Sequence, residues 1–435
     1  MALQNPELRK KYLPTRAFMK FVGDFHIHSK YARATSKDMN VENLDKWAKI
    51  KGIGVISPGD FTHPVWFKEL QEKLEPTEAG LYKLKGSETG TRFLLTTEIS
   101  CIYTKGGQGR RVHLLIFAPS FQAVEKINTQ LGWRGNLKSD GRPIIGIDSK
   151  EVLKIVLDAH EDCMVIPAHA WTPWFSVFGS KSGFNSIEEC FDEYAQYIYA
   201  IETGLSSDPA MNWRLSQLDN ITLISNSDSH SLAKIGREAN VFDTEVSYEG
   251  IAAAIKKKDS SKFLFTVEFF PEEGKYHYDG HRLCEVSMKP EESKEHNNIC
   301  PKCGRPLTIG VLNRVAELAD RPAFDTDKPE GAIPFKSLIP LEEIIADALG
   351  IGVISRKVRE EYEKLIHELG SEFQILLDAE APALRSATLP EIAEGIMRVR
   401  EGRVRIEPGY DGEYGKIKIF EQGEQQAVTP QKSLF

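Results

Sequence analysis

Short apolar runs alternate with amphipathic stretches along the first 270 residues of the chain. The runs are typical of buried strands and predict them at 21–27, 53–57, 92–99, 111–117, 163–168, 198–202, 221–225 and 263–267. Helical spacing of apolar residues follows in the stretches between them, at 41–50, 148–160, 187–194, 212–218 and 248–258. This alternation favours a closed α/β barrel over residues 1–270 rather than an open sheet.

The pattern changes near residue 270. Residues 271–312 are polar and turn-rich and carry closely spaced cysteines, which predicts a small zinc-binding module. Residues 313–420 contain helical stretches followed by two strand-like runs, which predicts a C-terminal α+β region. The last segment, 421–435, is polar, and we expect it to be a flexible tail.

Composition and charge narrow the class of protein. The 435 residues carry a net charge of −8, which argues against a generally basic nucleic-acid binder but is compatible with a local basic groove. The N-terminal segment is charged and lacks the apolar core of a signal peptide. Because no apolar run approaches the roughly 20 residues of a membrane span, we expect a cytoplasmic protein.

Histidines and carboxylates gather at, or just beyond, the ends of the predicted strands. Nine positions share this placement: His26, His28, Asp60, His63, Glu98, His113, His169, Asp228 and His230. The C-terminal ends of barrel strands meet on one rim, where such side chains converge. Nine ligands exceed the need of one ion, so the pattern predicts a hydrolytic centre of two or three divalent ions, of Zn²⁺, Mn²⁺ or Mg²⁺.

Spacing within this set indicates which side chains share an ion. His26 and His28 are two residues apart on a strand, so both project from one face. Asp228 and His230 repeat this spacing on another strand. Glu98 ends the run LLTTE and is the natural carboxylate to bridge two ions.

Other positions near the set have less defined roles. Asp24 opens the pattern D-x-H-x-H, either as a ligand or as an acceptor that fixes an imidazole tautomer. Asp60 and His63 are close in the sequence and compete for one role, and His113 lies inside its predicted strand. The sequence leaves these roles open.

The segment after residue 270 carries a separate set of ligands. Two close pairs are present, His281 with Cys284 and Cys300 with Cys303. The run CPKCGRP has the form of a zinc-knuckle turn, and two such pairs predict a closed structural zinc site. His277 and His296 are alternative fourth ligands. A redox-active Cys-x-x-Cys pair is disfavoured because it needs a thioredoxin-like βαβ context, which this segment lacks.

The order of the motifs HIHS, GDFTH, a strand ending in glutamate, PAHA and SDSH resembles that of the polymerase-and-histidinol-phosphatase (PHP) superfamily. The resemblance implies a distorted (β/α)₇ barrel that holds up to three divalent ions for phosphoester hydrolysis. Many members carry another histidine soon after the first pair, and the run KYARATSKD offers none. The third metal site is therefore expected to be incomplete or to use a different ligand.

Farther along, the runs SDSHSLAKIGREAN, NNICPKCGRPLTIGVLNRV and PFKSLIPLEEIIA resemble the endonuclease Q family. This resemblance covers most of the chain and is more specific than the barrel motifs alone. It implies a DNA-repair endonuclease that hydrolyses the phosphodiester on the 5′ side of a deaminated base (hypoxanthine, uracil or xanthine) or of an abasic site.

The reaction expected from these motifs is metal-assisted phosphodiester hydrolysis, in which an activated water attacks the phosphorus. It leaves 3′-hydroxyl and 5′-phosphate ends. The expected catalytic residues are Asp228, Glu98 and His169, with Asp228 as both ligand and proton acceptor. The expected cofactors are two or three divalent ions in the barrel and one structural zinc.

Recognition of the damaged base is expected from residues 170–191, which follow His169 directly. Deamination turns an exocyclic amine into a carbonyl, so a pocket of hydrogen-bond donors accepts the lesion once the base has left the stack. The candidates for stacking or donating are Trp171, Trp174, Phe175, Phe178, Gly179, Ser180 and Lys181. The alternative is an aromatic cluster that packs this loop onto the barrel. Arg237 is expected to contact a phosphate or to pair with a barrel carboxylate.

The end of the chain carries a short motif. Gln431, Leu434 and Phe435 resemble a box that docks on a sliding clamp, although the usual second aromatic residue is missing. The motif predicts the clamp PCNA as a partner, besides DNA that carries deaminated bases or abasic sites.

Two other functions compete with the nuclease hypothesis. A small-molecule phosphoesterase, such as histidinol-phosphate phosphatase, would share the barrel motifs but gives no reason for the zinc module and the aromatic segment. A non-enzymatic DNA- or clamp-binding scaffold would keep the barrel, but the nearly complete ligand set argues against it.

Overall fold

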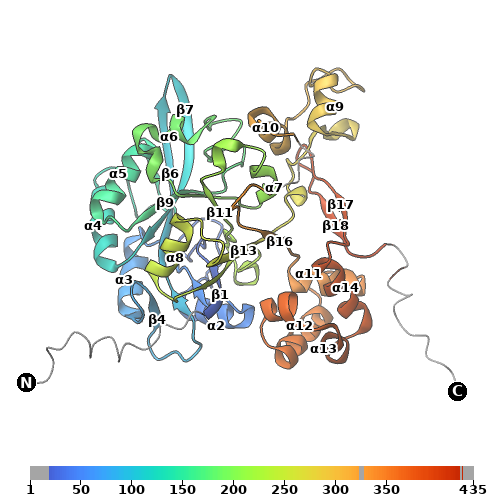
Figure 1. The fold of residues 1–435 in the computed structure, drawn as a ribbon, viewed down its shortest axis with the longest axis horizontal. Helices are drawn as coiled ribbons and strands as arrows, with labels where there is room; N and C mark the ends of the chain where they lie inside the picture. Colours follow the sequence, from blue (N-terminus) through green and yellow to red (C-terminus); the bar gives the residue numbers. More distant parts are fainter. Residues whose placement is uncertain (1–18, 323–327, 422–423, 425–435) are drawn as a thin grey trace, which may run out of the picture.

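The computed structural model describes residues 19–322, 328–421 and 424. A barrel of strands and helices forms the N-terminal part, and a small module and a group of helices follow it (Figure 1). The predicted clamp-binding residues Gln431, Leu434 and Phe435 lie outside the described residues.

The strands of the barrel hydrogen-bond in three groups. The first sheet runs in the order β16 (Phe335–Ser337), β13 (Phe263–Glu268), β12 (Ala239–Thr244), β1 (Met19–Asp24), β2 (Val55–Ile56), β5 (Arg92–Phe93), β4 (Tyr82–Leu84) and β3 (Leu74–Pro76). The second runs β8 (Ile144–Ile145), β6 (Leu95–Lys105), β7 (Gln108–Ala118) and β9 (Met164–Pro167), and the third pairs β10 (Ala200–Glu202) with β11 (Thr222–Ile224). A bridge between Ile27 and Ser229 brings the segments that follow β1 and β11 side by side, so the residues of both lie on one rim.

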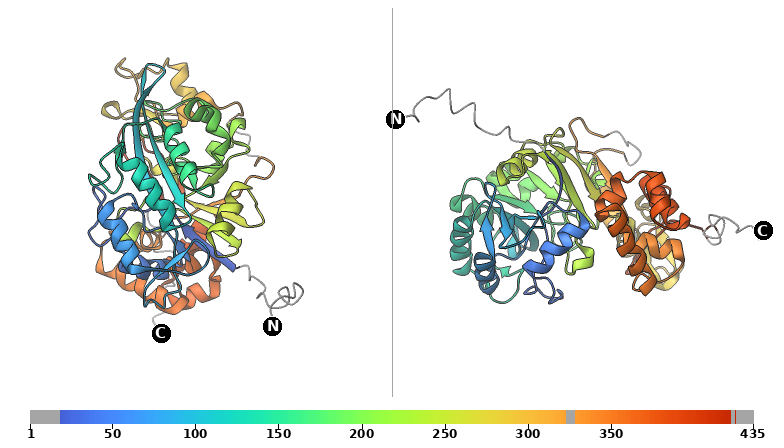
Figure 2. Two further views of the ribbon diagram at one scale, coloured as in Figure 1. Left: turned by 90° about the vertical axis from the view of Figure 1, so that its left-hand side faces the viewer. Right: turned by 90° about the horizontal axis from the view of Figure 1, so that it is seen from below.

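Helices pack around these strands, as Figures 1 and 2 show. They are α2 (Val41–Lys51), α3 (Pro64–Lys73), α4 (Phe121–Gly132), α5 (Ser149–Ala159), α6 (Ile187–Phe191), α7 (Pro209–Asn212) and α8 (Tyr248–Lys256). Side chains satisfy the free backbone N–H groups where several of them begin; Asn40 caps α2, Ser120 caps α4 and Asp148 caps α5. These caps fix the positions at which the three helices begin.

The predicted α/β barrel is confirmed, and each predicted strand has a counterpart. The barrel departs from regular alternation, because β6 and β7 form an antiparallel hairpin and β12 pairs antiparallel with β1 and β13. Strand β12 is absent from the predicted set because polar residues interrupt its apolar ones. Among them, Asn240 is buried and donates from Nδ2 to Ser225 O at 2.6 Å and to Asn226 Oδ1 at 3.0 Å.

All but one of the predicted helices are present, with shifts at their ends. Helices α3 and α4 were not predicted. The prediction of a helix over 212–218 is wrong. Helix α7 ends at Asn212, and only a 3₁₀ turn forms at Ser216–Leu218. Ser216 donates its backbone N–H to Asp320 Oδ1 at 2.9 Å, and this bond replaces a helical one.

Beyond the barrel the chain forms the cysteine-bearing module, returns to the barrel sheet and ends in a helical group (Figures 1 and 2). The module contains β14 (Asp279–His281), β15 (Val286–Met288) and α9 (Pro290–Glu295), followed by α10 (Val311–Leu318). Strand β16 then pairs in parallel with β13. The C-terminal region contains α11 (Leu341–Leu349), α12 (Arg356–Leu369), a π-helical turn (Gln374–Asp378), α13 (Ala381–Ala387), α14 (Pro390–Arg400), β17 (Arg405–Glu407) and β18 (Lys416–Lys418).

The C-terminal helices share one continuous apolar core with the barrel. At their junction, Lys51 Nζ of α2 lies 2.6 Å from Glu372 Oε2, and both side chains are buried. Tyr362 donates its hydroxyl to the same carboxylate at 2.7 Å. A buried charge pair with additional hydrogen bonds fixes the geometry of a contact, so the helical region is docked firmly on the barrel. Among the described residues no helix has the length and apolarity to cross a membrane.

Candidate metal centre

Two groups of metal-ligating side chains meet at the barrel rim. The first contains His26, His28, Glu98 and Asp228, and the second contains Glu98, His113 and His169. Within each group the ligand atoms lie within 4.8 Å of one another. Because Glu98 belongs to both groups, the rim offers two adjacent sites with a carboxylate between them.

The ligand atoms of the first group face one another. His28 Nε2 lies 3.2 Å from Glu98 Oε2 and 3.1 Å from Asp228 Oδ1, and His26 Nε2 lies 3.5 and 3.6 Å from these two oxygens. Both Nε2 atoms and Asp228 Oδ1 are buried and have no hydrogen-bond partner within the described part of the chain. Buried polar atoms normally have partners, and a divalent cation between these atoms would satisfy all of them. The residues therefore fit a metal ion.

The second group combines two residues of the β6–β7 hairpin with His169, which follows β9. His113 Nδ1 lies 2.7 Å from Glu98 Oε1, and His169 Nε2 lies 3.1 Å from that oxygen. In the hairpin, Glu98 is opposite Leu115 and His113 is opposite Ser100, so the side chains of Glu98 and His113 share one face. The antiparallel course of β7 explains why His113 reaches the rim from inside its strand.

A buried carboxylate that the sequence analysis did not select orients two of these ligands. Glu202, at the end of β10, lies 3.0 Å from His26 Nδ1 and accepts the backbone N–H of His169 at 2.9 Å. Asn226 Nδ2 donates to the same carboxylate at 2.9 Å. A carboxylate on the far ring nitrogen sets the imidazole tautomer, which leaves His26 Nε2 for the metal. In the sequence, the one indication of this role is that Glu202 ends a predicted strand.

We expect Glu202→Gln to weaken metal binding by about 10- to 100-fold, because the amide would present a donor to His26 Nδ1–H. Titration of Mn²⁺ into the metal-free protein, followed by calorimetry, measures the change. Excess Mn²⁺ should restore most of the activity. Glu249→Gln, at an exposed position on α8, is the matched control. Unchanged affinity in Glu202→Gln would contradict this role.

Asp60 and Asp24 hold the ligands in place through hydrogen bonds. Asp60 lies 3.0 Å from His28 Nδ1 and accepts from the backbone N–H and the hydroxyl of Ser29 at 2.6 and 2.7 Å. Asp24 accepts the backbone N–H groups of Ser227 and Gly236 at 3.1 and 2.9 Å. Burial raises the pKa of Asp24 to about 6. Asp60 thus orients an imidazole, and Asp24 braces the loop that carries Asp228.

The structure does not bring His63 and His230 into either group. His63 Nδ1 accepts the backbone N–H of Trp66 at 3.4 Å and so caps α3, while its ring stacks on Tyr31 at 4.4 Å between centroids. His230 Nδ1 donates to the carbonyl of Asp228 at 3.0 Å, and its ring lies 4.5 Å from that of His28. Both rings therefore border the centre without joining its ligand atoms.

Three rim residues have a strained backbone. Asp60, His169 and Asp228 have φ angles of 50°, 30° and 45°, in the left-handed region. Such conformations cost about 1–3 kcal/mol each and concentrate at functional sites. Gly204 lies directly against one of them, since a Cβ at this position would be 2.5 Å from His169 Cβ. The packing around the rim therefore enforces the positions of these side chains.

The charges of the centre favour a cation. Burial alone would lower the pKa values of His26 and His28, but the surrounding carboxylates raise both well above the usual value. Burial would likewise raise the pKa of Glu98, whereas Arg142 and His113 hold it well below its usual range. Metal binding at this centre is therefore expected to displace protons from the imidazoles and to weaken at low pH.

The aromatic loop, residues 170–191, is only partly exposed for contact with a DNA base. Trp171 and Phe178 are buried, lie 4.9 Å apart between ring centroids and pack inside the loop, as in the packing alternative. Phe175 packs against His113 at 4.7 Å. Trp174 is 47% exposed, and of the other candidates Ser180 and Lys181 are exposed and Gly179 is buried. Arg237 donates from Nε to the carbonyl of Ser227 at 2.9 Å, beside Asp228.

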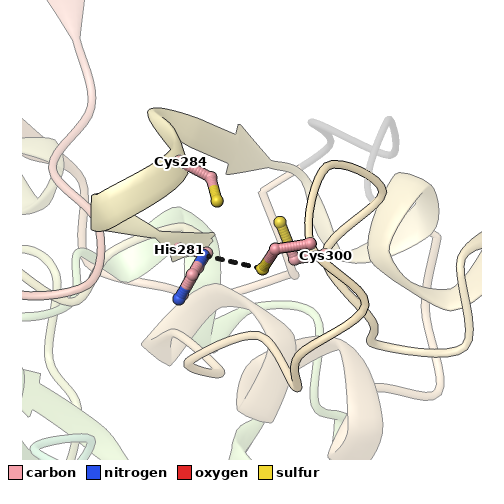
Figure 3. Close-up of side chains that lie close together, drawn as sticks. His281, Cys284 and Cys300 are labelled. Atoms are coloured by element: carbon pink, nitrogen blue, oxygen red, sulfur yellow. Dashed lines mark hydrogen bonds between the residues drawn. The ribbon is translucent and has the colours of Figure 1, made fainter.

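A separate group lies in the module after the barrel. The ligand atoms of His281, Cys284, Cys300 and Cys303 lie within 4.8 Å of one another, and Figure 3 shows the first three converging. Cys303 Sγ lies 3.5 Å from His281 Nδ1. Burial would raise the pKa of Cys300, but the backbone N–H groups of Lys302 and Cys303 lower it to about 7, which favours the thiolate that zinc binds. The alternative ligands, His277 and His296, are outside the group.

Comparisons with known proteins cover nearly the whole chain. The family described as the MJ0043 C-terminal domain matches residues 340–403. The uncharacterized protein YqxK of Bacillus subtilis is 29% identical over 418 residues, which are 92% of this chain and 99% of YqxK. The uncharacterized protein MJ0043 of Methanocaldococcus jannaschii is 35% identical over 262 residues. That match spans 58% of this chain but only 32% of the longer MJ0043.

Two solved structures are similar in sequence and in fold. One is the lesion-specific endonuclease PfuEndoQ of Pyrococcus furiosus, 31% identical, with a TM-score of 0.82 over 93% of this chain and 96% of that one. The other is endonuclease Q in complex with a 27-mer duplex substrate that has an abasic lesion at the active site. It is also 31% identical, with a TM-score of 0.81 over 95% of this chain and 100% of that one.

Proposed function

The chain belongs to the endonuclease Q family, and on this basis we propose that it is a metal-dependent DNA-repair endonuclease. We propose further that it hydrolyses the phosphodiester on the 5′ side of a deaminated base or an abasic site. The observation that carries the proposal is the pair of ligand groups that share Glu98. Glu98 and the histidines of the two groups would hold a pair of ions, which would supply stabilisation of the attacking and leaving oxygens of a phosphodiester.

The side chains of the rim have distinct parts in this reaction. When bound, divalent ions supply an activated water and offset the charge that develops on the phosphate and on the leaving oxygen. Asp228, Glu98 and the imidazoles of His26, His28, His113 and His169 would hold them. The Asp228 side chain is 27% exposed, while that of Glu98 is fully buried. Asp228 is therefore the carboxylate within reach of substrate, where it can accept the proton of the attacking water.

Bond cleavage on the 3′-oxygen side of the phosphorus accounts for the expected ends. The water oxygen forms a bond to phosphorus, and the bond from phosphorus to O3′ breaks. O3′ keeps the electron pair and takes up a proton. The products are a 3′-hydroxyl and a 5′-phosphate on the lesion-bearing fragment.

Recognition of the lesion is proposed for the exposed part of the aromatic loop. A base must leave the stack before its edge can be read, and an abasic site avoids this cost. Trp174 offers an exposed ring for stacking, and Ser180 and Lys181 offer donors for the carbonyl that deamination creates. A donor pocket disfavours adenine and cytosine, whose amines would leave its donors unpaired.

The test uses labelled duplexes that contain one abasic site, one deoxyinosine or one deoxyuridine, and an undamaged duplex as control. We expect a nick directly 5′ to each lesion in Mn²⁺ or Mg²⁺, with no cleavage of the control and none in EDTA. Direct ligation of the nicked strand, without any treatment of its ends, would check the 3′-hydroxyl and 5′-phosphate. Turnover of simple phosphomonoesters without cleavage of any duplex would contradict the proposal.

A further inference from the structure

One cation faces the metal centre, and it belongs to none of the motifs. Arg142 lies in the segment between α4 and β8, and its Nη1 donates to Glu98 Oε2 at 2.9 Å. This oxygen is the one that lies 3.2 Å from His28 Nε2. The side chain of Arg142 is 30% exposed, while that of Glu98 is fully buried. The guanidinium therefore stands between the ligand atoms and the open side of the rim.

The backbone around Arg142 is held from three directions. The Arg142 N–H donates to Asp140 Oδ1 at 3.1 Å, and the neighbouring Gly141 N–H donates to the Tyr31 carbonyl at 3.1 Å. The carbonyl of Pro143 accepts from Ser100 N–H on β6 at 3.0 Å. These bonds place the arginine on a rigid support, as functional groups require.

Gly141 brings this support close to the centre. A Cβ on Gly141 would lie 2.3 Å from Asp60 Oδ2, the oxygen that accepts from Ser29. Glycine thus lets the segment approach the carboxylate that orients His28. The close packing of Gly141 against Asp60 therefore places Arg142 at the rim.

A permanent positive charge beside a group of metal ligands needs a reason. A guanidinium repels divalent ions, so its presence here raises the energy of the loaded centre unless an anion compensates. Glu98 forms an ion pair with Arg142, but both groups of ligands share this carboxylate. A guanidinium carries five N–H donors, and in the described residues only Nη1 bonds to a side chain. The remaining donors suit an anion that arrives with the substrate.

We propose that Arg142 binds a non-bridging oxygen of the scissile phosphate and stabilises the charge that develops on it during cleavage. The proposal rests on the proposed phosphodiesterase function and adds a catalytic residue to it. Planar, forked donors match the oxygens of a phosphate, which a lysine contacts only as a point charge. Arginines with this role in phosphoryl transfer contribute about 10³- to 10⁵-fold to the rate, and a single oxyanion donor contributes about 10²- to 10³-fold.

The competing explanation is that Arg142 only neutralises Glu98 and so positions a metal ligand. The two explanations predict different losses of binding when Arg142 is replaced. A phosphate-binding arginine leaves metal binding intact and weakens the binding of anions. A counter-ion for Glu98 changes metal binding and leaves the affinity for phosphate, per loaded centre, unchanged.

The experiment compares the full-length wild type with Arg142→Gln, Arg142→Lys and Arg134→Gln. Arg134 is an exposed arginine near the start of the same segment, and among the described residues its side chain bonds only to Gln130, so it is the matched control. Each protein is loaded with Mn²⁺, and its metal content is measured by elemental analysis. Calorimetry then measures the affinity for inorganic phosphate, and single-turnover assays measure cleavage of a duplex with one abasic site.

We expect Arg142→Gln to keep its metal, to bind phosphate about 10-fold more weakly and to cleave about 100-fold or more slowly. Arg142→Lys should recover part of both losses, and Arg134→Gln should match the wild type. Loss of metal, or wild-type phosphate affinity in the loaded Arg142→Gln protein, would overturn the proposal. If the wild type fails to cleave lesion DNA but binds phosphate through Arg142, the phosphate role stands and the DNA substrate is wrong.

Discussion

Asp228→Ala is expected to abolish cleavage of lesion-containing DNA while leaving DNA binding largely intact. The carboxylate belongs to the first ligand group, and its Oδ1 is buried without a hydrogen-bond partner in the described residues. Its removal takes away a metal ligand and the proposed proton acceptor together. We expect the single-turnover rate on an abasic duplex to fall by about 10³-fold or more, in line with the loss of other catalytic carboxylates.

The charge of Asp228 is the reason to expect so large an effect. Burial alone would raise its pKa, but the imidazoles of His26 and His28 hold it far below the usual value. The side chain is therefore ionised throughout the working pH range and is ready to bind a cation. Asp228→Asn keeps the shape and removes the charge, so it should cleave nearly as poorly as Asp228→Ala.

Measurement of binding separates this role from a structural one. Gel-shift titration with the abasic duplex should give dissociation constants within about threefold of the wild type, because phosphate contacts along the duplex supply most of the affinity. Asp158→Ala, at an exposed position on α5, should behave as the wild type in both assays. Cleavage by Asp228→Ala at the wild-type rate would remove this carboxylate from the centre.

The sequence predicts the part of this centre that follows from strand periodicity. His26 and His28 alternate with an apolar residue, so their common face could be read directly. Glu98 ends an apolar run, and its bridging position between two groups of ligands agrees with that placement. Periodicity does not predict which strands pair with one another. The antiparallel hairpin brings His113 to Glu98, although His113 lies inside its strand.

The residues that support the ligands were harder to find. Glu202 follows a short strand without any motif, and its importance comes from contacts with residues far away in the sequence. Arg142 lies in a polar loop, where arginine is ordinarily a solvated residue. Trp171 and Phe178 were candidates for base stacking but are buried. Aromatic side chains suit both a core and a binding surface, so the sequence alone does not distinguish the two. Only the packing of the loop decides between these possibilities.

The module that follows the barrel is connected to the rim by hydrogen bonds. Asp279, two residues before His281, accepts from Gly310 N–H at 2.7 Å and from Asn313 Nδ2 at 2.6 Å at the start of α10. On the same helix, Arg314 is buried and donates to the carbonyls of Phe178 and Phe184 at 3.1 and 3.0 Å. The proposed zinc ligands, α10 and the aromatic loop thus form one connected unit.

Cys300→Ser is therefore expected to affect both the module and the rim. It removes one ligand from the proposed zinc site. Because the apolar cluster around Cys300, Val286 and Leu307 is small, we expect the module to depend on the metal for its folding. Zinc content should fall by about one equivalent per chain. Limited proteolysis should cut the variant, but not the wild type, within residues 282–303. The loosened loop should slow cleavage of an abasic duplex by about 10-fold, since small displacements of positioning groups have effects of this order or larger.

Metal binding at the barrel rim should be unaffected by this substitution, which makes the prediction specific to the module. The rim ligands lie on other elements, so Mn²⁺ binding and phosphate affinity should remain at wild-type values in Cys300→Ser. His296→Ala provides the control, because this exposed histidine of the same module lies outside the ligand group. It should keep its zinc and its resistance to protease. Loss of zinc by His296→Ala would show that the fourth ligand is misassigned, and retention of zinc by Cys300→Ser would remove Cys300 from the site. If Cys300→Ser loses its zinc and still cleaves at the wild-type rate, the connection through Arg314 does not position the loop.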